Sequence, residues 1–366
     1  MENFEKYGLK TNPFRITPAT NPDELIWAGF KDTKNAIQER IKRSIQTTPS
    51  TLVLNWGEYG SGKTHAARYF NKDTVLKKIS EDLPTPISFN ICFPQSKEPT
   101  KDIYTQLIDR IDINLIRSII KFENEEINNI LNSITDNTFI KNLIKLILDK
   151  SVSESILKTF LYGNYKISEA LIKSGVSRKL STENDYVDFL GALFSFLTYK
   201  KEFCSNIILW IDEFESIALQ TSANISSVNN FIRTLIDNSP NNILIFLNLT
   251  QSAMMDREDL SEYLQSAVKS RIKTQIELRI PDPETLKDYL MELLNDKINR
   301  IDGSGYNSYE PFTEEVIDTI IKENKDVSLR QYNEIFSSLL EYAVSDNKSN
   351  IDLNYYNYIK PELIGY

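Results

Sequence analysis

The sequence predicts an α/β fold with a parallel five-stranded sheet, a helical insertion and a C-terminal helical domain. Four short apolar runs and a plausible fifth strand are separated by segments with helical periodicity, which is typical of parallel strands covered on both faces. A glycine-rich segment directly follows the first run, and a helical pattern follows that segment. The expected strands are 51–56, 87–93, 206–211, 242–249 and 274–278.

We expect three regions along the 366-residue chain. Residues 1–50 form an N-terminal lead and a helix, 51–280 form the α/β core, and 281–366 form a helical lid domain with a short tail. Apolar stripes predict the helical insertion at about 105–180, because a crossover between parallel strands needs only about a dozen residues. The stripes fit either a small subdomain with its own core or a pair of helices that binds a partner.

The composition excludes several classes of function. The net charge of −9 lacks the global basic footprint of many nucleic-acid-binding proteins, although a local basic patch remains compatible with it. Two cysteines, Cys92 and Cys204, lie too far apart in sequence for a metal-ligand spacing, and their small number fits a reducing compartment. The single histidine leaves no zinc site built on several histidines. Without an apolar run near 18 residues or a leader pattern, we expect a cytoplasmic protein and no membrane partner.

The glycine-rich segment matches the pattern G-x-x-x-x-G-K-[ST] in full. With the residue that follows, it reads Gly57, Glu58, Tyr59, Gly60, Ser61, Gly62, Lys63, Thr64 and His65. Glycines let successive backbone amides point at phosphate oxygens, and the following helix adds the positive end of its dipole. Lys63 can reach the β- and γ-phosphates, and the Thr64 hydroxyl can bind Mg²⁺. We therefore expect an ATP-binding loop, in which His65 packs on the first turn of the helix.

Two carboxylates end the third expected strand. Asp212 and Glu213 follow the apolar run 207–211, and the C-terminal ends of parallel strands meet at one edge of a sheet. We expect Asp212 to hold Mg²⁺ and Glu213 to polarise the attacking water, because phosphoryl transfer depends mainly on positioning and charge neutralisation. Alone, an Asp-Glu pair also fits a strand followed by a solvated turn.

Together these motifs resemble AAA+ P-loop ATPases, and most closely the clade of origin-recognition-type initiators. That clade also includes transposition regulators and phage-defence ATPases of the BREX kind, whose "GxYGSGKTH" loops are similar to 57–65. The lead Gly8–Phe14 is similar to the clade's "GL…NPF" opening. Phe30 follows Gly29 where the clade usually carries a Gly-Arg step near the adenine.

The resemblance implies further site residues on the expected strands. Asn90, on the second strand, matches the polar residue that restrains the catalytic glutamate. The fourth strand ends at the place of a polar sensor of the γ-phosphate or the water, for which Thr250 is the first choice and Asn248 the second. A strand asparagine that needs a hydrogen-bond partner, or a capping residue, would fit these positions equally.

The resemblance also implies two arginines at the nucleotide. Arg271 matches the arginine finger that one subunit presents to its neighbour's ATP, which implies a homo-oligomer with Arg271 acting in trans. Arg330 matches the second sensor, which reaches the nucleotide from the lid. The alternatives are a solvated basic helix end for Arg271 and a surface arginine for Arg330.

The resemblance leads to two hypotheses about function. In the first, the chain binds and hydrolyses Mg-ATP to drive assembly or switching on a DNA target, with local basic clusters at 40–43 and 269–273 as candidate contacts. In the second, it is a nucleotide-gated interaction module of a multi-protein system, in which the insertion binds a protein partner. An inactive nucleotide sensor is disfavoured because the loop and the acidic pair are both complete.

Overall fold

The computed structural model describes residues 4–163, 171–172, 175–176, 178–251, 260–301 and 307–363. The chain forms two compact units. Unit 1 comprises Met1–Ile37, Trp56–Lys72 and Glu277–Tyr366, and unit 2 comprises Gln38–Asn55 and Asp73–Ile276. The N-terminal lead, the glycine-rich loop and the C-terminal helices therefore belong to one unit.

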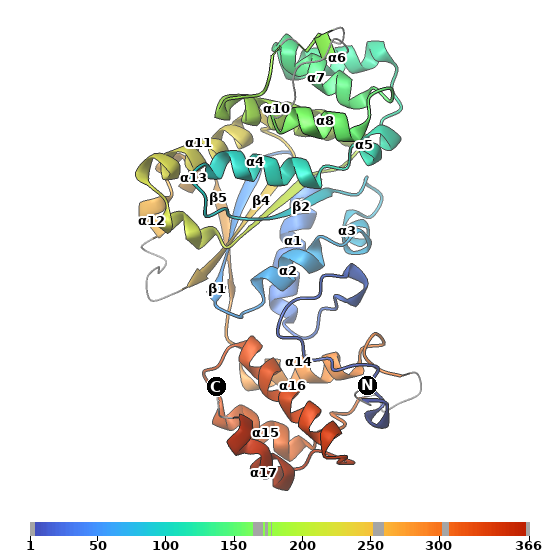
Figure 1. Cartoon of the computed structure of the whole chain (residues 1–366), viewed down its shortest axis with the longest axis vertical. Coiled ribbons are helices and arrows are strands. Elements are labelled where there is room, and N and C mark those ends of the chain that lie inside the picture. The colour runs from blue at the N-terminus through green and yellow to red at the C-terminus, as the bar shows by residue number, and fades with distance from the viewer. Residues whose placement is uncertain are drawn as a thin grey trace. The chain divides into compact units, whose positions relative to one another are not determined.

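A five-stranded sheet with the order β2-β3-β4-β1-β5 confirms the predicted α/β fold (Figure 1). Its strands are β1 (Thr51–Glu58), β2 (Ile87–Cys92), β3 (Ile207–Asp212), β4 (Ile243–Gln251) and β5 (Ile272–Leu278). Strand β3 runs parallel to both β2 and β4. The β2–β3 register pairs Cys92 with Asp212, so both strands end at the same level of the sheet.

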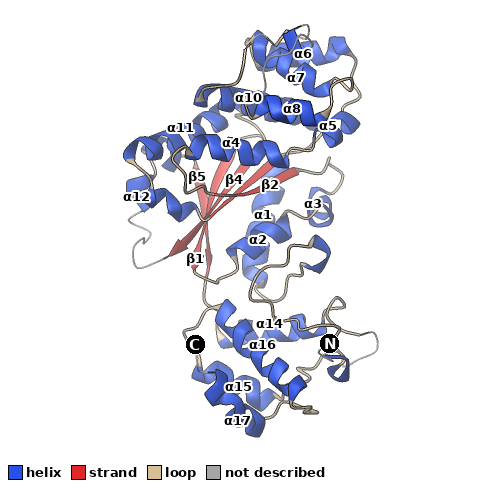
Figure 2. Ribbon diagram, viewed as in Figure 1, coloured by secondary structure: helices blue, strands red, loops and turns tan. Residues whose placement is uncertain are grey.

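The apolar run of β3 is explained by its central place in the sheet. All six residues of this strand are buried, and helices flank the strands in Figure 2. Trp210 of β3 stacks on Phe246 of β4 with ring centroids 3.8 Å apart. A strand that is covered on both faces has no solvent side, so it lacks the polar alternation of a half-exposed strand.

Unit 2 also contains the helices that cover the sheet and those of the expected insertion. They are α3 (Asp73–Ser80), α4 (Pro99–Arg110), α5 (Ile113–Ile119), α6 (Asn124–Ile134), α7 (Thr138–Leu148), α8 (Glu154–Leu161), α10 (Glu183–Leu197), α11 (Ser222–Asn238), α12 (Leu260–Tyr263) and α13 (Ser266–Lys269). Helix α1 (Lys31–Gln46), which the sequence predicts at 33–45, runs from unit 1 into unit 2. Helix α4 packs on β2 and α11, and α10 packs on α11.

The expected insertion is helical where the structure describes it. Helices α5 to α8 pack on one another and on α10 and α4. Arg117 of α5 is buried and donates hydrogen bonds to the carbonyl oxygens of Ile147, Asp149 and Val152, at 2.7, 2.7 and 2.8 Å. It thereby caps the C-terminal end of α7. The positions 164–170, 173–174 and 177 of the expected insertion lie outside the described residues, and its limits stay a prediction.

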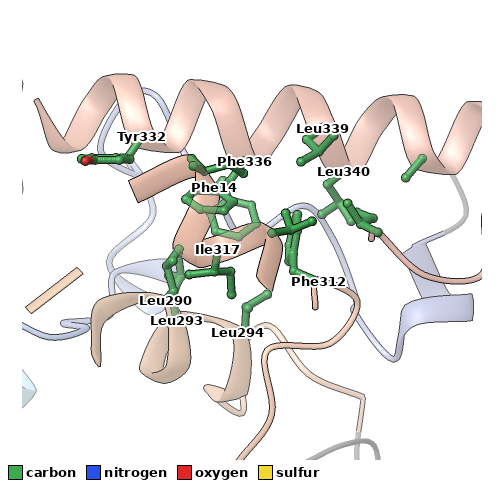
Figure 3. Packing of buried hydrophobic residues seen from close by; sticks show 14 of the residues in the cluster. Phe14, Leu290, Leu293, Leu294, Phe312, Ile317, Tyr332, Phe336, Leu339 and Leu340 are labelled. Carbon is green, nitrogen blue, oxygen red and sulfur yellow. The ribbon is translucent and has the colours of Figure 1, made fainter. Parts of the chain in front are cut away.

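Unit 1 joins the N-terminal lead to the C-terminal helices through a shared apolar core. The helices are α2 (Lys63–Phe70), α14 (Pro283–Asn295), α15 (Glu314–Glu323), α16 (Leu329–Ser345) and α17 (Leu353–Leu363). Phe14 of the lead lies between Phe312 and Phe336, with ring centroids 5.8 and 5.4 Å away (Figure 3). Buried Arg300 donates to the carbonyl oxygens of Tyr7 and Glu310, at 2.8 and 2.6 Å. The lead is therefore an integral part of this unit.

Local signals set the helix ends of the C-terminal region. Asp282 caps α14 by accepting a bond from the Thr285 amide, and Pro283 is the first helical residue. Ser328 and Gln331 form a capping box that starts α16. The sequence predicts no helix in the tail, but the structure has α17 there. This helix is held because Tyr355, Tyr356 and Ile359 are buried against α15 and α16. None of the described helices is both long and apolar enough to cross a membrane.

Candidate nucleotide-binding site

The glycine-rich loop connects β1 to α2 in unit 1, and its three glycines are required for two different reasons. Gly60 and Gly62 have φ angles of 78° and 95°, in the left-handed region that favours glycine. Gly57 is required by space, because a Cβ atom there would lie 2.5 Å from the Leu278 carbonyl oxygen and 2.7 Å from Ser61 Oγ. The loop therefore needs glycine both for its backbone conformation and for its close approach to Leu278 of β5.

The ammonium group of Lys63 is held by the loop itself. Lys63 is buried, and its Nζ donates to the carbonyl oxygens of Gly57 and Glu58, each at 2.8 Å. Ser61 Oγ accepts a third bond at 3.3 Å. Thr64 follows as the second residue of α2. One cation and one hydroxyl thus begin a helix directly after a glycine loop, the arrangement that suits a polyphosphate with its magnesium.

His65, in the first turn of α2, is hydrogen-bonded to the N-terminal lead. Its Nε2 donates to the Ile26 carbonyl oxygen at 2.8 Å, and the ring lies 6.1 Å from that of Trp27. Burial lowers the pKa of His65, so the ring is neutral near pH 7. Its contacts are those of a packing residue.

Arg330 of the lid helix α16 contacts the loop. Its Nη1 donates to the Tyr59 hydroxyl at 2.5 Å, and the guanidinium lies 5.2 Å from the centre of the Tyr59 ring. Its Nε also lies 3.6 Å from Glu334. A Cβ on Gly60 would be 2.8 Å from Arg330 Cβ. The structure therefore brings the predicted lid arginine to the glycine loop, although it does not test its role toward a nucleotide.

The Gly29-Phe30 step packs on α14. Gly29 and Phe30 have φ angles of 57° and 48°, and a Cβ on Gly29 would lie 2.9 Å from Tyr289 Cα. The Gly29 amide donates to Glu292 Oε2 at 2.8 Å, and the Phe30 ring lies 6.0 Å from the Tyr289 ring. Phenylalanine at this position thus adds an apolar contact to the core of unit 1.

In unit 2, Asp212 lies at the end of β3 within a chain of side-chain amides. Asn248 Nδ2 of β4 donates to Asp212 Oδ1 at 3.2 Å, and Asn55 Nδ2 of β1 donates to Asn248 Oδ1 at 2.9 Å. The Phe93 amide donates to the Asp212 carbonyl oxygen at 2.8 Å. All three side chains are buried, so the orientation of the carboxylate is set by the sheet.

Glu213 is exposed and adopts a left-handed backbone conformation, with φ 55° and ψ 34°. Its Oε2 accepts a hydrogen bond from Cys92 Sγ at 3.2 Å. Burial, together with the nearby Glu213, raises the pKa of the Cys92 thiol to about 12, so the thiol is protonated and can donate. The sequence does not predict this contact, because it depends on the pairing of β2 with β3, which brings Cys92 beside the end of β3.

The two polar positions predicted near the acidic pair differ in their contacts. Asn90 lies two residues before Cys92 on the same face of β2, and its role as a restraint on the glutamate stays a prediction. Of the two sensor candidates, Asn248 contacts Asp212, whereas the Thr250 amide donates to Glu215 Oε2 at 3.0 Å. The choice between Thr250 and Asn248 as sensor also stays open.

Arg271 lies between α13 and β5 and bonds within unit 2. Its Nη1 donates to the Ala267 carbonyl oxygen at 2.5 Å, and its Nη2 pairs with Asp237. About a quarter of the side chain is exposed, at 26%. The role of Arg271 toward a neighbouring subunit stays a prediction.

The metal-binding potential of the described residues is limited. Among them, no three His, Cys, Asp or Glu residues group closely enough to hold a metal ion. Mg²⁺ commonly binds one or two protein oxygens and completes its shell with phosphates and water. The Asp212 carboxylate and the Thr64 hydroxyl provide oxygen ligands of this kind, so the chemistry of the predicted ligands fits Mg²⁺.

Comparison with known proteins shows the fold. No protein-family model and no curated protein sequence matches the chain. Among solved structures, ORC2 of Aeropyrum pernix, described as ADPNP-ADP complexes, has a TM-score of 0.56 and 13% identity over 98% of this chain and 72% of its own. ORC1 of Aeropyrum pernix in complex with DNA has a TM-score of 0.50 and 11% identity over 97% of this chain and 70% of its own.

Cdc6p of Pyrobaculum aerophilum is similar to the same extent, with a TM-score of 0.50 and 11% identity over 98% of this chain and 72% of its own. With the sheet order, the glycine loop and the C-terminal helices, these similarities define an AAA+ type of P-loop fold. Within that class, the fold is similar to that of the Orc and Cdc6 proteins, which confirms the fold that the resemblance implies.

Proposed function

We propose that this chain is an ATPase that binds Mg-ATP at Gly57–Thr64 and hydrolyses it with Asp212 and Glu213. The loop between β1 and α2 gives the main support for the proposal. In this loop Gly60 and Gly62 adopt left-handed conformations, and Lys63 Nζ donates hydrogen bonds to loop carbonyl oxygens. A loop shaped in this way presents backbone amides and an ammonium group to phosphate oxygens.

Each polar group in the proposal has one task. Lys63 and the loop amides bind the β- and γ-phosphates, and Glu213 accepts a proton from the attacking water. Thr64 and Asp212 are the protein ligands for Mg²⁺, which would neutralise phosphate charge when bound. Asn90 restrains Glu213, Thr250 or Asn248 orients the water or the γ-phosphate, and Arg330 acts from the lid.

Nucleotide binding is tested with labelled ATP and Mg²⁺ on the full chain. Lys63→Ala should remove binding, because the loop loses its only side-chain cation. Lys78→Ala is the control, since Lys78 lies exposed on α3 outside the loop and should leave binding unchanged. Undiminished binding by the Lys63 variant would overturn the proposed role of the loop.

We also propose that the chain hydrolyses ATP as a homo-oligomer in which Arg271 acts on the neighbour's nucleotide. Such an arginine contributes about 10³–10⁵ to the rate in related phosphoryl-transfer enzymes. Arg271→Ala and Glu213→Gln should each abolish turnover, and mixing the two inactive variants should restore part of it. In the mixture, a subunit with an intact Glu213 can receive Arg271 from its neighbour. If mixing restores no activity although the variants assemble together, Arg271 does not act in trans.

DNA is the proposed target of the nucleotide-driven assembly. The support is the fold, which is shared with an initiator solved in complex with DNA, and the basic clusters at 40–43 and 269–273. Within the first cluster Lys42 pairs with Glu81, and within the second Arg271 pairs with Asp237, so part of this charge is neutralised. The test is duplex binding across a salt series, with and without ATP, because phosphate contacts are strongest at low salt. Absence of binding at low salt would overturn the proposal.

The helical insertion favours the second candidate function, a nucleotide-gated module that binds a protein partner. Helices α5 to α8 exceed what a crossover requires, and they expose Leu115 and Ile156 to 47% and 40%. Leu115→Glu with Ile156→Glu should then abolish co-purification of the partner while ATP binding persists. Leu219→Glu, at an exposed leucine outside the insertion, is the matched control.

A further inference from the structure

The thiol of Cys92 makes a direct bond to the proposed catalytic carboxylate. Cys92 is the last residue of β2, and its Sγ lies 3.2 Å from Glu213 Oε2. An ordinary thiol, with a pKa near 8.5, is mostly protonated at neutral pH and can donate to a carboxylate. Glu213 Oε1 has no hydrogen bond within the described part of the chain. One carboxylate oxygen is therefore held, and the other is left to accept a water proton.

Backbone hydrogen bonds hold the main chain that carries this exposed thiol. Gln106 of α4 binds the backbone of Cys92 twice, since its Oε1 accepts from the Cys92 amide at 3.1 Å and its Nε2 donates to the Cys92 carbonyl oxygen at 2.8 Å. On the other side, the Phe93 amide donates to the Asp212 carbonyl oxygen at 2.8 Å. The C-terminal end of β2, an edge strand, is thus held by hydrogen bonds to α4 and to β3, next to Asp212 and Glu213.

Glu213 needs such a contact because its own backbone does little to orient its side chain. It follows the end of β3 in a left-handed conformation, and the side chain is exposed. An exposed glutamate loses side-chain rotamer freedom when it is ordered. A hydrogen bond from a fixed donor reduces the number of rotamers available before the reaction and leaves less to order in the transition state.

We propose that Cys92 is a positioning residue, which orients the Glu213 carboxylate to accept a proton from the attacking water, through a hydrogen bond from the thiol to Oε2. The proposal rests on the proposed role of Glu213 as the base. Cys92 acts through Glu213 and does not contact the nucleotide. Its loss should lower the rate of the chemical step and leave the affinity for ATP unchanged.

The test compares Cys92→Ala, which removes the donor, with Cys92→Ser, which retains one. We expect kcat to fall about three- to tenfold in Cys92→Ala, the range for the loss of one ordinary hydrogen bond, because a thiol is a weak donor. Cys92→Ser should recover most of this loss, and both variants should bind ATP as the native chain does. Cys204→Ala is the matched control, because Cys204 is buried and bonds to the Leu197 carbonyl oxygen instead. An unchanged or raised kcat in Cys92→Ala, or equal losses in the alanine and serine variants, overturns the proposal.

Two further measurements separate this inference from the proposed function. In a Glu213→Gln background, adding Cys92→Ala should cause no further loss, because the oriented group is already gone. The S–H stretching band of Cys92, identified by its loss in Cys92→Ser, should move to higher frequency in Glu213→Ala. If the band moves but Glu213→Gln retains full turnover, the bond exists and Glu213 is not the base. If the band does not move, the thiol does not bind Glu213 and the inference itself fails.

Discussion

The glycine loop of unit 1 and the acidic group of unit 2 are built in different ways. The loop is continuous in sequence, and its shape follows from the glycines at 57, 60 and 62. Even the Lys63 ammonium is held by carbonyl oxygens of the same loop. The acidic group is assembled from residues of different strands and from Glu213, which follows β3. It contains Asn55, Cys92, Asp212, Glu213 and Asn248.

This difference shows what local sequence can specify. The residues of the loop form one contiguous motif and can be recognised from the sequence, while the space around Gly57 and Gly60 is set by Leu278 and Arg330. A group built from four strands depends on the register of the sheet, which a single sequence does not state. We therefore expect substitutions in the loop to change nucleotide affinity, and substitutions in the acidic group to change the rate of hydrolysis.

The largest expected effect comes from Glu213→Gln. The amide cannot accept the water proton, so turnover should fall by about 10²–10⁴, the usual contribution of a general base. Affinity for ATP should stay within a few-fold of the native value, because the loop is unchanged. Single-turnover hydrolysis and equilibrium binding measure the two quantities separately. The control is Glu215→Gln, which keeps an acceptor for the Thr250 amide. Full turnover by the Glu213 variant would contradict its assignment.

The sequence predicts most of the fold because each strand carries its own signal. The runs 206–211 and 242–249 become β3 and β4 within one or two residues, since both strands are buried and almost wholly apolar. The start of α14 is predicted from Asp282 and Pro283, whose capping role is local. Helix α17 was not predicted, because it has no strong apolar stripe of its own. It is stabilised by packing on α15 and α16.

The candidate site is predictable only in part, for the same reason. The loop and the acidic pair are specified by contiguous motifs, but the partner of Glu213 is specified by the pairing of β2 with β3. The pairing of Arg271 with Asp237 depends on how α11 packs near α13, which the sequence pattern does not indicate. The contact of Arg330 with Tyr59 likewise requires the lid to pack on the loop within unit 1.

Phe14→Ala tests whether unit 1 depends on its lead. Phe14 is 3% exposed and packs against two aromatic rings of the C-terminal region, so the change should cost about 3–5 kcal/mol of stability. Hydrogen exchange should accelerate in α15 and α16 and remain slow in β3 and β4, if the two units open separately. Ile16→Ala, at a position 43% exposed, should have little effect. Equal acceleration in the sheet would show that the units open together.

Asn248→Ala should have a smaller effect, directed at hydrolysis. The change removes a donor to Asp212 and an acceptor from Asn55, so that each of these buried groups loses one hydrogen bond, at a cost of about 1–3 kcal/mol. We expect a turnover about tenfold lower, with ATP affinity changed less. Thr250→Ala is the matched comparison on the same strand, because the backbone bond from Thr250 to Glu215 remains. A larger loss in Thr250→Ala would identify Thr250 as the sensor.

Tyr59→Phe should have the smallest effect, and this effect should be on ATP affinity, as we expect for a substitution in the loop. Removing the hydroxyl deletes the 2.5 Å bond from Arg330 and leaves the ring beneath the guanidinium. The contact between Tyr59 and Arg330 should therefore weaken by about 0.5–1.5 kcal/mol. ATP affinity should change by less than about tenfold, because a free energy of this size corresponds to no more than that. Arg330 keeps Glu334 as a partner, and its Nη1 becomes available to a phosphate oxygen. Single-turnover rates at saturating ATP should be unchanged. Tyr358→Phe, at an exposed tyrosine of α17, should alter neither quantity. If the Tyr59 variant instead lowers the rate at saturation, the loop contributes to chemistry as well as to affinity, and the division of tasks between the loop and the acidic group does not hold.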